Sequence, residues 1–288
     1  MAIVVELVSN ICNSKCKWCF STYETSKKID KGFMAEANFK KFIDINKGAI
    51  TNIIPFSHGE SLLHPDWVNM MEYATSNGYV IESIHTNLAM PLTNEHMVML
   101  CRVKYLTINV GGANKDTHYI NTGTDFNVVS SNLQRLMKVR REPTSVKMVI
   151  NKHNQGQKEE LVQYIKSIST NIQVSTFPLY LATADSDQID ISKWIENNIA
   201  EGVECRDHIE NKNGQYVVKP KTNKCTDKTV SVRFNGITHL CCRARTSEGS
   251  VGNAFITSIK DILASDKCVA LKKLMDKRQY ISYCKVCS

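Results

Sequence analysis

Three cysteines stand close together near the start of the sequence, Cys12, Cys16 and Cys19, at spacings of four and three positions. Thiolate sulfur is a soft ligand that selects zinc, copper or iron–sulfur clusters. A closed structural zinc site normally has four protein ligands, and disulfides use cysteines in pairs. Three thiolates therefore favour an iron–sulfur cluster with one open corner over a zinc knuckle or a disulfide.

The C-x3-C-x2-C spacing, with the aromatic residue Trp18 before the last cysteine, resembles the signature of the radical S-adenosylmethionine (radical SAM) superfamily. The resemblance implies a [4Fe–4S] cluster on these cysteines, with SAM chelated to the fourth iron. It also implies that an electron from the cluster cleaves SAM to a 5′-deoxyadenosyl radical, which abstracts hydrogen from a substrate. The protein then positions these groups and excludes water.

Hydrophobic periodicity predicts that strands and helices alternate along the first 200 residues. Strands are expected over 2–9, 50–56, 79–84, 105–110, 145–151 and 172–178. Helical crossovers between them make the sheet parallel, with right-handed connections. Because a full eight-stranded barrel usually takes about 250 residues, six strands predict an α/β fold with a partial barrel. This arrangement resembles the (β/α)6 core of radical SAM enzymes.

Polar residues follow two of these strands, at the edge where parallel folds keep their chemistry. Ser57-His58-Gly59-Glu60 looks like the Gly-Gly-Glu motif of the family, with His58 in place of the first glycine. The resemblance places Gly59 and Glu60 at the amino group of SAM. The alternative for Glu60 is that it caps a helix, where acids are common.

Three further positions resemble SAM contacts of the family. Thr86-Asn87 looks like its Thr-Asn-Gly turn, with Leu88 in place of the glycine. Asn109 matches the position that contacts the SAM ribose, and Lys147 could reach the SAM carboxylate. A lysine at a strand edge is, however, more often simply solvated.

A second group of cysteines begins where the alternation stops, after residue 200. Asn235-Gly236 lies between two β-type runs and predicts a hairpin over 229–242. That hairpin would bring Cys225 towards Cys241, and two more thiolates follow at Cys284 and Cys287. Four thiolates could hold either zinc or a cluster.

The spacing of this group, with a helix predicted over 258–275, resembles the twitch subdomain, which is the shortened SPASM module of radical SAM enzymes. The resemblance implies a second, auxiliary [4Fe–4S] cluster. We therefore expect a radical SAM partial barrel over 1–200 and a twitch subdomain, a β-hairpin plus a helix, over 201–288.

Three of the remaining cysteines differ in their surroundings. Cys101 and Cys268 share helical faces with apolar residues, so both are predicted to be core side chains. Cys205 lies in a polar segment outside any periodic element. It is a candidate hydrogen donor, and an incidental cysteine is the alternative.

The net charge of +8 is concentrated near the C-terminus, where residues 201–288 hold 16 Lys/Arg against 9 Asp/Glu. A solvated surface, an anionic substrate, an acidic electron donor such as flavodoxin or ferredoxin, or compensation for cluster thiolates would explain it. The N-terminus lacks a basic signal region, and no apolar run approaches the about 20 residues that span a bilayer. We expect a cytoplasmic protein with no membrane or nucleic-acid partner.

For the function we predict a two-electron oxidation of a small, polar, sugar- or cyclitol-like substrate, since the chain resembles the cyclitol dehydrogenases of this superfamily. The auxiliary cluster would accept the second electron. The alternatives are a radical epimerase of a carbohydrate or peptide, in which Cys205 supplies hydrogen, and an enzyme that modifies ribosomal peptides. The non-enzyme alternatives are an iron–sulfur electron carrier and a zinc-stabilised binding module.

Overall fold

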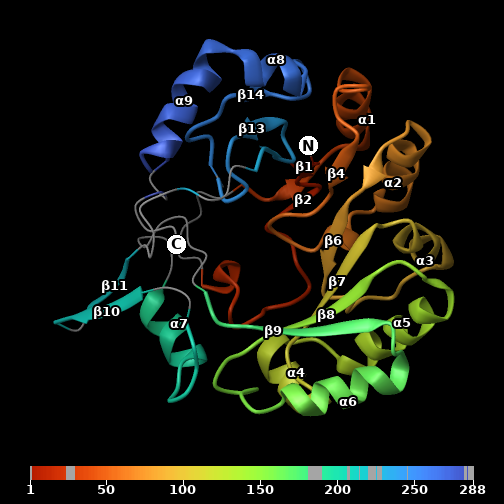
Figure 1. The fold of residues 1–288 in the computed structure, drawn as a ribbon, viewed down its shortest axis with the longest axis vertical. Helices are drawn as coiled ribbons and strands as arrows, with labels where there is room; N and C mark the ends of the chain where they lie inside the picture. The colour runs from red at the N-terminus through yellow and green to blue at the C-terminus, as the bar shows by residue number, and fades with distance from the viewer. Residues whose placement is uncertain are drawn as a thin grey trace.

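Two groups of strands curve around the centre of the computed structural model, with helices on their outer side (Figure 1). The model describes residues 2–23, 30–180, 190–205, 208–213, 215–219, 225, 229–244, 246–281 and 284. The six-stranded sheet has the order β14-β13-β12-β1-β4-β5, and the four-stranded sheet has the order β6-β7-β8-β9. The strands of the two sheets are β1 (Ala2–Val5), β4 (Asn52–Ile54), β5 (Val80–Ile81), β6 (Ser83–Thr86), β7 (Tyr105–Val110), β8 (Thr144–Val149), β9 (Ile172–Phe177), β12 (Ser231–Val232), β13 (Ile237–His239) and β14 (Gly252–Asn253).

The helices follow the predicted alternation. They are α1 (Glu36–Ile45), α2 (Trp67–Ser76), α3 (Asn94–Cys101), α4 (Lys115–Thr122), α5 (Phe126–Val139), α6 (Lys158–Ile168), α7 (Ile191–Asn198), α8 (Ile259–Ala264) and α9 (Asp266–Asp276), with the short 3-10 helices η1 (Phe20–Thr22) and η2 (Ser61–Leu63). Two small hairpins join β2 (Val8–Ser9) to β3 (Gly32–Phe33) and β10 (His208–Lys212) to β11 (Gln215–Lys219). The prediction of a mixed α/β fold with a parallel sheet is confirmed, since the pairs β1–β4, β4–β5 and β6 to β9 are all parallel.

Some predicted boundaries are wrong for local reasons. The strand predicted over 79–84 is divided at Glu82 into β5 and β6, which belong to different sheets. The helix predicted over 258–275 is divided at Ser265, whose hydroxyl accepts from Cys268 N and caps α9. Helix α4 was not predicted because its sequence is mostly polar. It is set by its ends, the capping Asn114 and Gly123 in the left-handed conformation at φ 70°.

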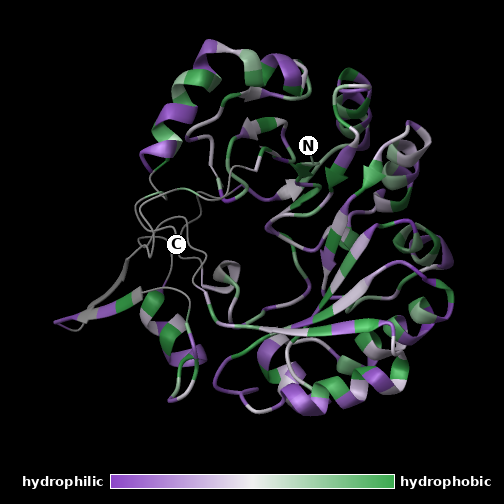
Figure 2. Ribbon diagram, in the orientation of Figure 1, coloured by the Kyte–Doolittle hydropathy of each residue, from purple (hydrophilic) through white to green (hydrophobic). Residues whose placement is uncertain are grey.

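Residues alternate in burial along β6, β7 and β8, so each strand has an apolar face and a polar face. Ile108 and Val146 are fully buried against the helices, where they join the main core. The residues between them are half-buried and polar: Ser83, His85, Thr107, Asn109, Ser145 and Lys147. Hydrophobic residues run through the strands, while the helices alternate between hydrophobic and hydrophilic turns (Figure 2). The polar face is the face turned away from the helices.

The C-terminal segment extends the sheet that begins with β1. Strand β12 pairs in parallel with β1 through Val4 and Ser231, and β12 and β13 form the predicted antiparallel hairpin. Helix α8 is joined to α1 by one side chain, because the buried Asn46 accepts from Ile259 N at 2.7 Å and donates to Phe42 O at 2.8 Å. Within the described part of the chain, no helix has the length and apolar character needed to cross a membrane.

Replacing Asn46 by alanine should weaken the attachment of the C-terminal segment, since it leaves the buried amide of Ile259 without its acceptor. We expect a loss of about 1–3 kcal/mol in the free energy of unfolding, measured by denaturant titration. The matched control is Asn77→Ala, which removes a similar bond from Nδ2 to the helix's own Tyr73 O at 2.9 Å. Equal losses of unfolding free energy in the two variants would contradict the role of Asn46 in attaching the C-terminal segment.

Candidate functional site

The loop that carries Cys12, Cys16 and Cys19 lies beyond the carboxyl end of β1 and has only short turns of its own. Its backbone is held by segments that follow other strands. Glu60 N donates to Ile11 O at 2.9 Å, and Lys15 N donates to Thr122 O at 2.8 Å. The loop therefore takes its shape from its neighbours.

The three thiols lie close enough to affect one another. The pKa of Cys12 is raised to about 12, mainly because the protein around its sulfur excludes water. The charges of Glu60 and Cys19 raise it further. The residue as a whole is exposed. The pKa of Cys16 lies well above its ordinary value because of burial, then because of Cys19 and Cys12. Without a metal the thiols of Cys12 and Cys16 hold their protons, so binding of iron would release protons.

This donor set fits an iron–sulfur cluster. Among the residues that the structure describes, no three His, Cys, Asp or Glu side chains form a group that could hold a metal ion. In a cluster each thiolate binds its own iron, so the sulfurs need not converge on one point. Three neighbouring soft thiolates on one loop match that requirement.

Glu60 is buried and connects the loop after β4 to the end of β6. Its Oε1 accepts from Leu62 N at 3.2 Å and Thr86 Oγ1 at 3.0 Å, and its Oε2 accepts from Asn87 N at 2.8 Å. Burial, the largest influence, raises the pKa of Glu60, and these hydrogen bonds oppose it. Glu60 does cap η2, as the alternative expected. A carboxylate has about four lone-pair sites, so the three bonds leave room for one more donor.

The Asn87 side chain lies close to three residues of the cysteine loop. Its Nδ2 lies 2.8 Å from Asn13 Oδ1, 2.9 Å from Ser14 Oγ and 3.7 Å from Cys12 Sγ. The Thr86-Asn87 pair signalled this turn in the sequence, although we did not count Asn87 among the site residues. Leu88 keeps a positive φ of 55°, a left-handed conformation that favours glycine.

A network of buried asparagines supports the other half of the loop. Asn198 Nδ2 donates to Lys17 O at 2.6 Å, and Lys17 N donates to Asn121 O at 2.9 Å. Asn151 joins the two supports, because its Nδ2 contacts Asn121 Oδ1 at 2.9 Å and Asn198 Oδ1 at 3.4 Å. Single asparagines far apart in the sequence form no recognisable motif, so this network could not be predicted from the sequence.

Asn109 and Lys147 are paired in register on β7 and β8, on the polar face of the sheet. Asn109 has no side-chain hydrogen bond to any described residue. Lys147 Nζ lies 3.9 Å from the centre of the Phe177 ring. His85 was not among the predicted site residues. It is half-buried and stacks on Phe56 with ring centres 4.4 Å apart. Burial, and then Lys147, lower the pKa of His85 to about 4.

Trp18 and Cys205 belong to a small second core with Trp194. Trp194 Nε1 donates to Trp18 O at 3.4 Å. Cys205 forms an isolated parallel bridge with Leu179, just after β9, and is half-buried. The structure thus gives Cys205 a place beside the sheet that the sequence did not predict.

The second cysteine group is described only in part, since Cys287 lies outside the described residues. Cys241 is buried, and Cys225 and Cys284 are half-buried against the main core. Burial raises the pKa of Tyr280 to about 12, with smaller contributions from thiols that include Cys241 and Cys284. The two cysteines therefore lie near one tyrosine. Cys268 is fully buried, and Cys101 packs against the core, as predicted.

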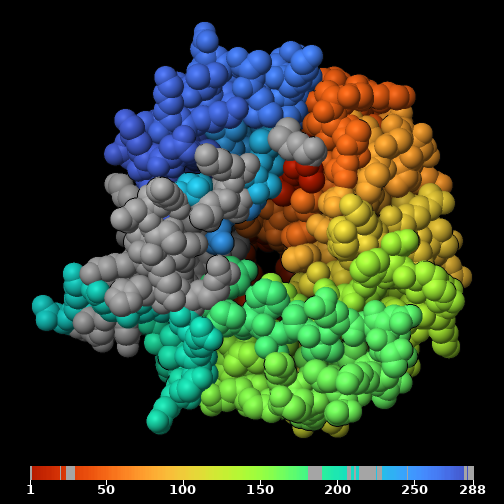
Figure 3. Space-filling view, viewed as in Figure 1, coloured from red at the N-terminus to blue at the C-terminus, as the bar shows by residue number. Residues whose placement is uncertain are grey.

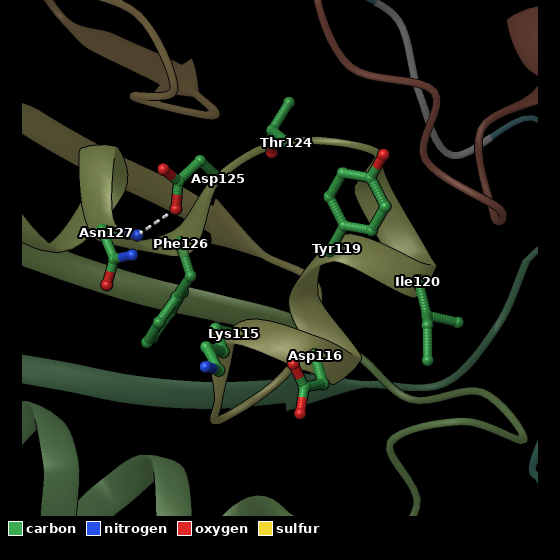
Figure 4. Close-up of a pocket in the computed structure, with 8 residues that line it drawn as sticks. All are labelled: Lys115, Asp116, Tyr119, Ile120, Thr124, Asp125, Phe126 and Asn127. Carbon is green, nitrogen blue, oxygen red and sulfur yellow. Dashed lines mark hydrogen bonds between the residues drawn. The ribbon is translucent and has the colours of Figure 1, made fainter.

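Figure 3 shows a hollow at the centre of the molecule, between the N-terminal, middle and C-terminal parts of the chain. A separate surface pocket of about 650 Å³ is formed by α4, the turn after it and the start of α5 (Figure 4). Its lining includes Lys115, Asp116 and Asp125, and no cysteine. It is thus distinct from the cysteine loop.

Comparison with known proteins finds the SPASM iron–sulfur cluster-binding domain over residues 224–288. One curated relative, an S-adenosylmethionine-dependent nucleotide dehydratase of Selenomonas ruminantium, is 29% identical over 112 residues, 38% of this chain and 39% of the relative. The chain thus matches well under half of that relative's length. The fold is similar to that of native anSMEcpe with bound AdoMet, which superposes with a TM-score of 0.66 and 16% identity, over 97% of this chain and 84% of the other. The chain thus matches the SPASM domain over its C-terminal residues and shares its fold with proteins whose structures hold AdoMet.

Two other solved structures show the range of molecules that proteins of this fold bind. Streptococcus suis SuiB bound to precursor peptide SuiA has a TM-score of 0.64 and 14% identity, covering 99% of this chain and 70% of that protein. BtrN in complex with AdoMet and 2-DOIA has a TM-score of 0.56 and 16% identity, covering 99% and 91%. At these identities the fold alone is shared, and the activity and substrate have to be inferred separately.

Gly59 should be essential for the conformation of the cysteine loop. A Cβ at Gly59, where φ is +140°, would lie 2.7 Å from Ile11 O. Gly59→Ala should therefore displace the loop and reduce its retained iron by about tenfold, measured by iron analysis of a protein that also carries Cys241→Ala. The control is Gly48→Ala, also at positive φ (+80°) but with no atom within 4 Å. Equal iron loss in both would show that clash with the loop is not the cause.

Proposed function

We propose that the chain cleaves SAM at the cysteine loop and abstracts hydrogen from a small polar substrate, which it oxidises by two electrons. One observation carries the proposal. The cysteine loop, Glu60 and Asn87 meet at the carboxyl ends of strands whose inner face presents His85, Asn109 and Lys147. Such a half-buried polar face is suited to a hydroxyl-bearing molecule.

The cofactors we propose are two [4Fe–4S] clusters and SAM. The first cluster would be bound by Cys12, Cys16 and Cys19, and the second by the C-terminal set of Cys225, Cys241, Cys284 and Cys287. When bound, the first cluster and SAM supply a carbon-centred radical that removes a hydrogen atom. The parallel strands would form a partial (β/α)6 barrel over 1–200, with the twitch subdomain over 201–288.

The residues of the chain would place SAM in this site. Glu60 would accept the SAM ammonium with its remaining acceptor position, beside Gly59. Asn109 would contact the ribose, Lys147 the carboxylate, and Trp18 would pack beside the loop. The availability of the Asn109 amide supports its part in this assignment.

In the oxidation, a carbinol carbon would give one hydrogen atom to the radical that SAM supplies when bound. Loss of the hydroxyl proton and of one further electron would then leave a carbonyl. The match to an iron–sulfur cluster-binding domain supports this route, because a cluster held there would be the acceptor of that electron. The similarity to BtrN, crystallised with AdoMet and 2-DOIA, supports a sugar- or cyclitol-like substrate.

A second candidate is modification of a peptide, including epimerisation. It is favoured by the similarity to SuiB, whose structure was solved with its precursor peptide. An epimerase needs a hydrogen donor on the opposite face of the substrate radical. Cys205, beside the end of β9, is the cysteine we would assign to that role.

The SAM-cleavage part of the proposal is tested with reconstituted, dithionite-reduced protein. We expect about eight irons per chain and formation of 5′-deoxyadenosine from SAM. Replacing Cys12, Cys16 and Cys19 together by alanine should leave about four irons and no 5′-deoxyadenosine. The control replaces the core cysteines Cys101 and Cys268 by alanine and should keep both values. A fully loaded wild-type protein that leaves SAM intact would contradict the proposal.

The fate of the substrate radical is tested by product mass in deuterated water. Oxidation predicts a product two daltons lighter than the substrate, with one SAM consumed per turnover, and it predicts that Cys205→Ala retains turnover. A product one dalton heavier, with deuterium on carbon, that disappears in Cys205→Ala would establish epimerisation instead. Cys101→Ala is the control for loss of a thiol elsewhere.

A further inference from the structure

A buried ionic network joins the SPASM domain to the segment that precedes the cysteine loop. Glu6 is 2% exposed, and its Oε1 lies 3.0 Å from His58 Nδ1. Its Oε2 accepts from Arg233 Nε at 3.2 Å. Arg233 is itself 2% exposed and also donates from Nη2 to Ser9 Oγ at 3.2 Å.

The three charged or titratable members stand at the carboxyl ends of three adjacent strands. Glu6 follows β1, Arg233 follows β12, and His58 lies in the loop after β4. These ends lead directly to the site, because Asn10 N donates to His58 O at 2.6 Å and Ile11 pairs with Gly59. The network therefore holds both backbone segments that fix the start of the cysteine loop.

The electrostatics make Arg233 necessary to this arrangement. Removing a carboxylate from water is costly unless it is paired and hydrogen-bonded. Burial, the largest influence, raises the pKa of Glu6, but His58 and Arg233 together bring the pKa below its ordinary value. Asp30 Oδ2 also lies 3.9 Å from Arg233 Nη1. His239 is nearby too, and its pKa is lowered to about 4 by burial and then by Arg233.

We propose that Arg233 is a positioning residue for the SAM site: by binding Glu6 and Ser9, this SPASM side chain fixes the backbone from which the cysteine loop starts. The proposal rests on the proposed function of that loop. It gives the SPASM domain a second task, which is independent of any cluster that it holds. Loss of Arg233 leaves Glu6 buried with His58 and one long bond from Phe234 N at 3.5 Å, so the segment over 6–12 should move.

The test compares Arg233→Met with Arg140→Met. Arg140 is an equally buried arginine that donates to Thr144 Oγ1, Leu100 O and Pro143 O, but it lies before β8, at the amino end of the strands. Both variants should lower the melting temperature. Arg233→Met alone should speed amide hydrogen exchange over residues 6–12 and raise the Kd for SAM by about tenfold or more, compared between samples of matched iron content. Arg233→Lys, which keeps the charge, should restore part of the slow hydrogen exchange and part of the SAM affinity.

The outcomes separate the two claims. Unchanged exchange over 6–12 in Arg233→Met, or equal effects from Arg140→Met, would overturn the positioning role even if the wild type cleaves SAM. A wild type that neither binds nor cleaves SAM would overturn the proposed function, and hydrogen exchange would still judge Arg233. If Arg233→Met does not fold, the same exchange and Kd comparison between Arg233→Lys and Arg140→Lys decides.

Discussion

The cysteine loop depends on hydrogen bonds from the rest of the fold, because a short irregular loop cannot satisfy its own backbone. Its amides and carbonyls are paired with residues after β4, after β7 and on α7, through Glu60, Thr122 and Asn198. Glu60 lies in the loop after β4, whereas Thr122 and Asn198 are the last residues of α4 and α7, in the connections where α/β folds vary most. A cluster on this loop would therefore sit on a support contributed by most of the fold.

The C-terminal segment also supports the start of the cysteine loop. Strand β12 pairs with β1, and the residue after each strand, Arg233 and Glu6, forms the buried ion pair beside the loop. A buried pair of this kind is weak evidence of stability, since apolar residues often serve as well. Its value in this fold is geometric, because a guanidinium fixes the direction of the groups it binds. Through Arg233, the segment that matches the SPASM domain thus contributes to the support of the cysteine loop.

The sequence predicted what regular patterns and close spacing can encode. The alternation of apolar runs gave the parallel α/β fold, and Asn235-Gly236 gave the hairpin. The spacing of the three cysteines predicted a cluster loop, and the cluster itself stays a prediction. Long-range polar contacts have no such pattern: the pairing of Glu6 with Arg233 spans 227 positions, and Asn198 reaches Lys17 across 181. His85 was missed because a single histidine in a strand looks like any other half-buried residue, and only the stacking on Phe56 distinguishes it.

The central claim is that the N-terminal cysteine loop holds a cluster whose open iron binds SAM, and electron–nuclear double resonance tests it most directly. The reduced protein is mixed with SAM that carries ¹⁵N in its methionyl amine. The account predicts a nitrogen hyperfine coupling to the cluster in the wild type, retained in Cys241→Ala and absent in Cys16→Ala. A wild-type protein that binds SAM with its cluster loaded and reduced, but shows no such coupling, would contradict the account.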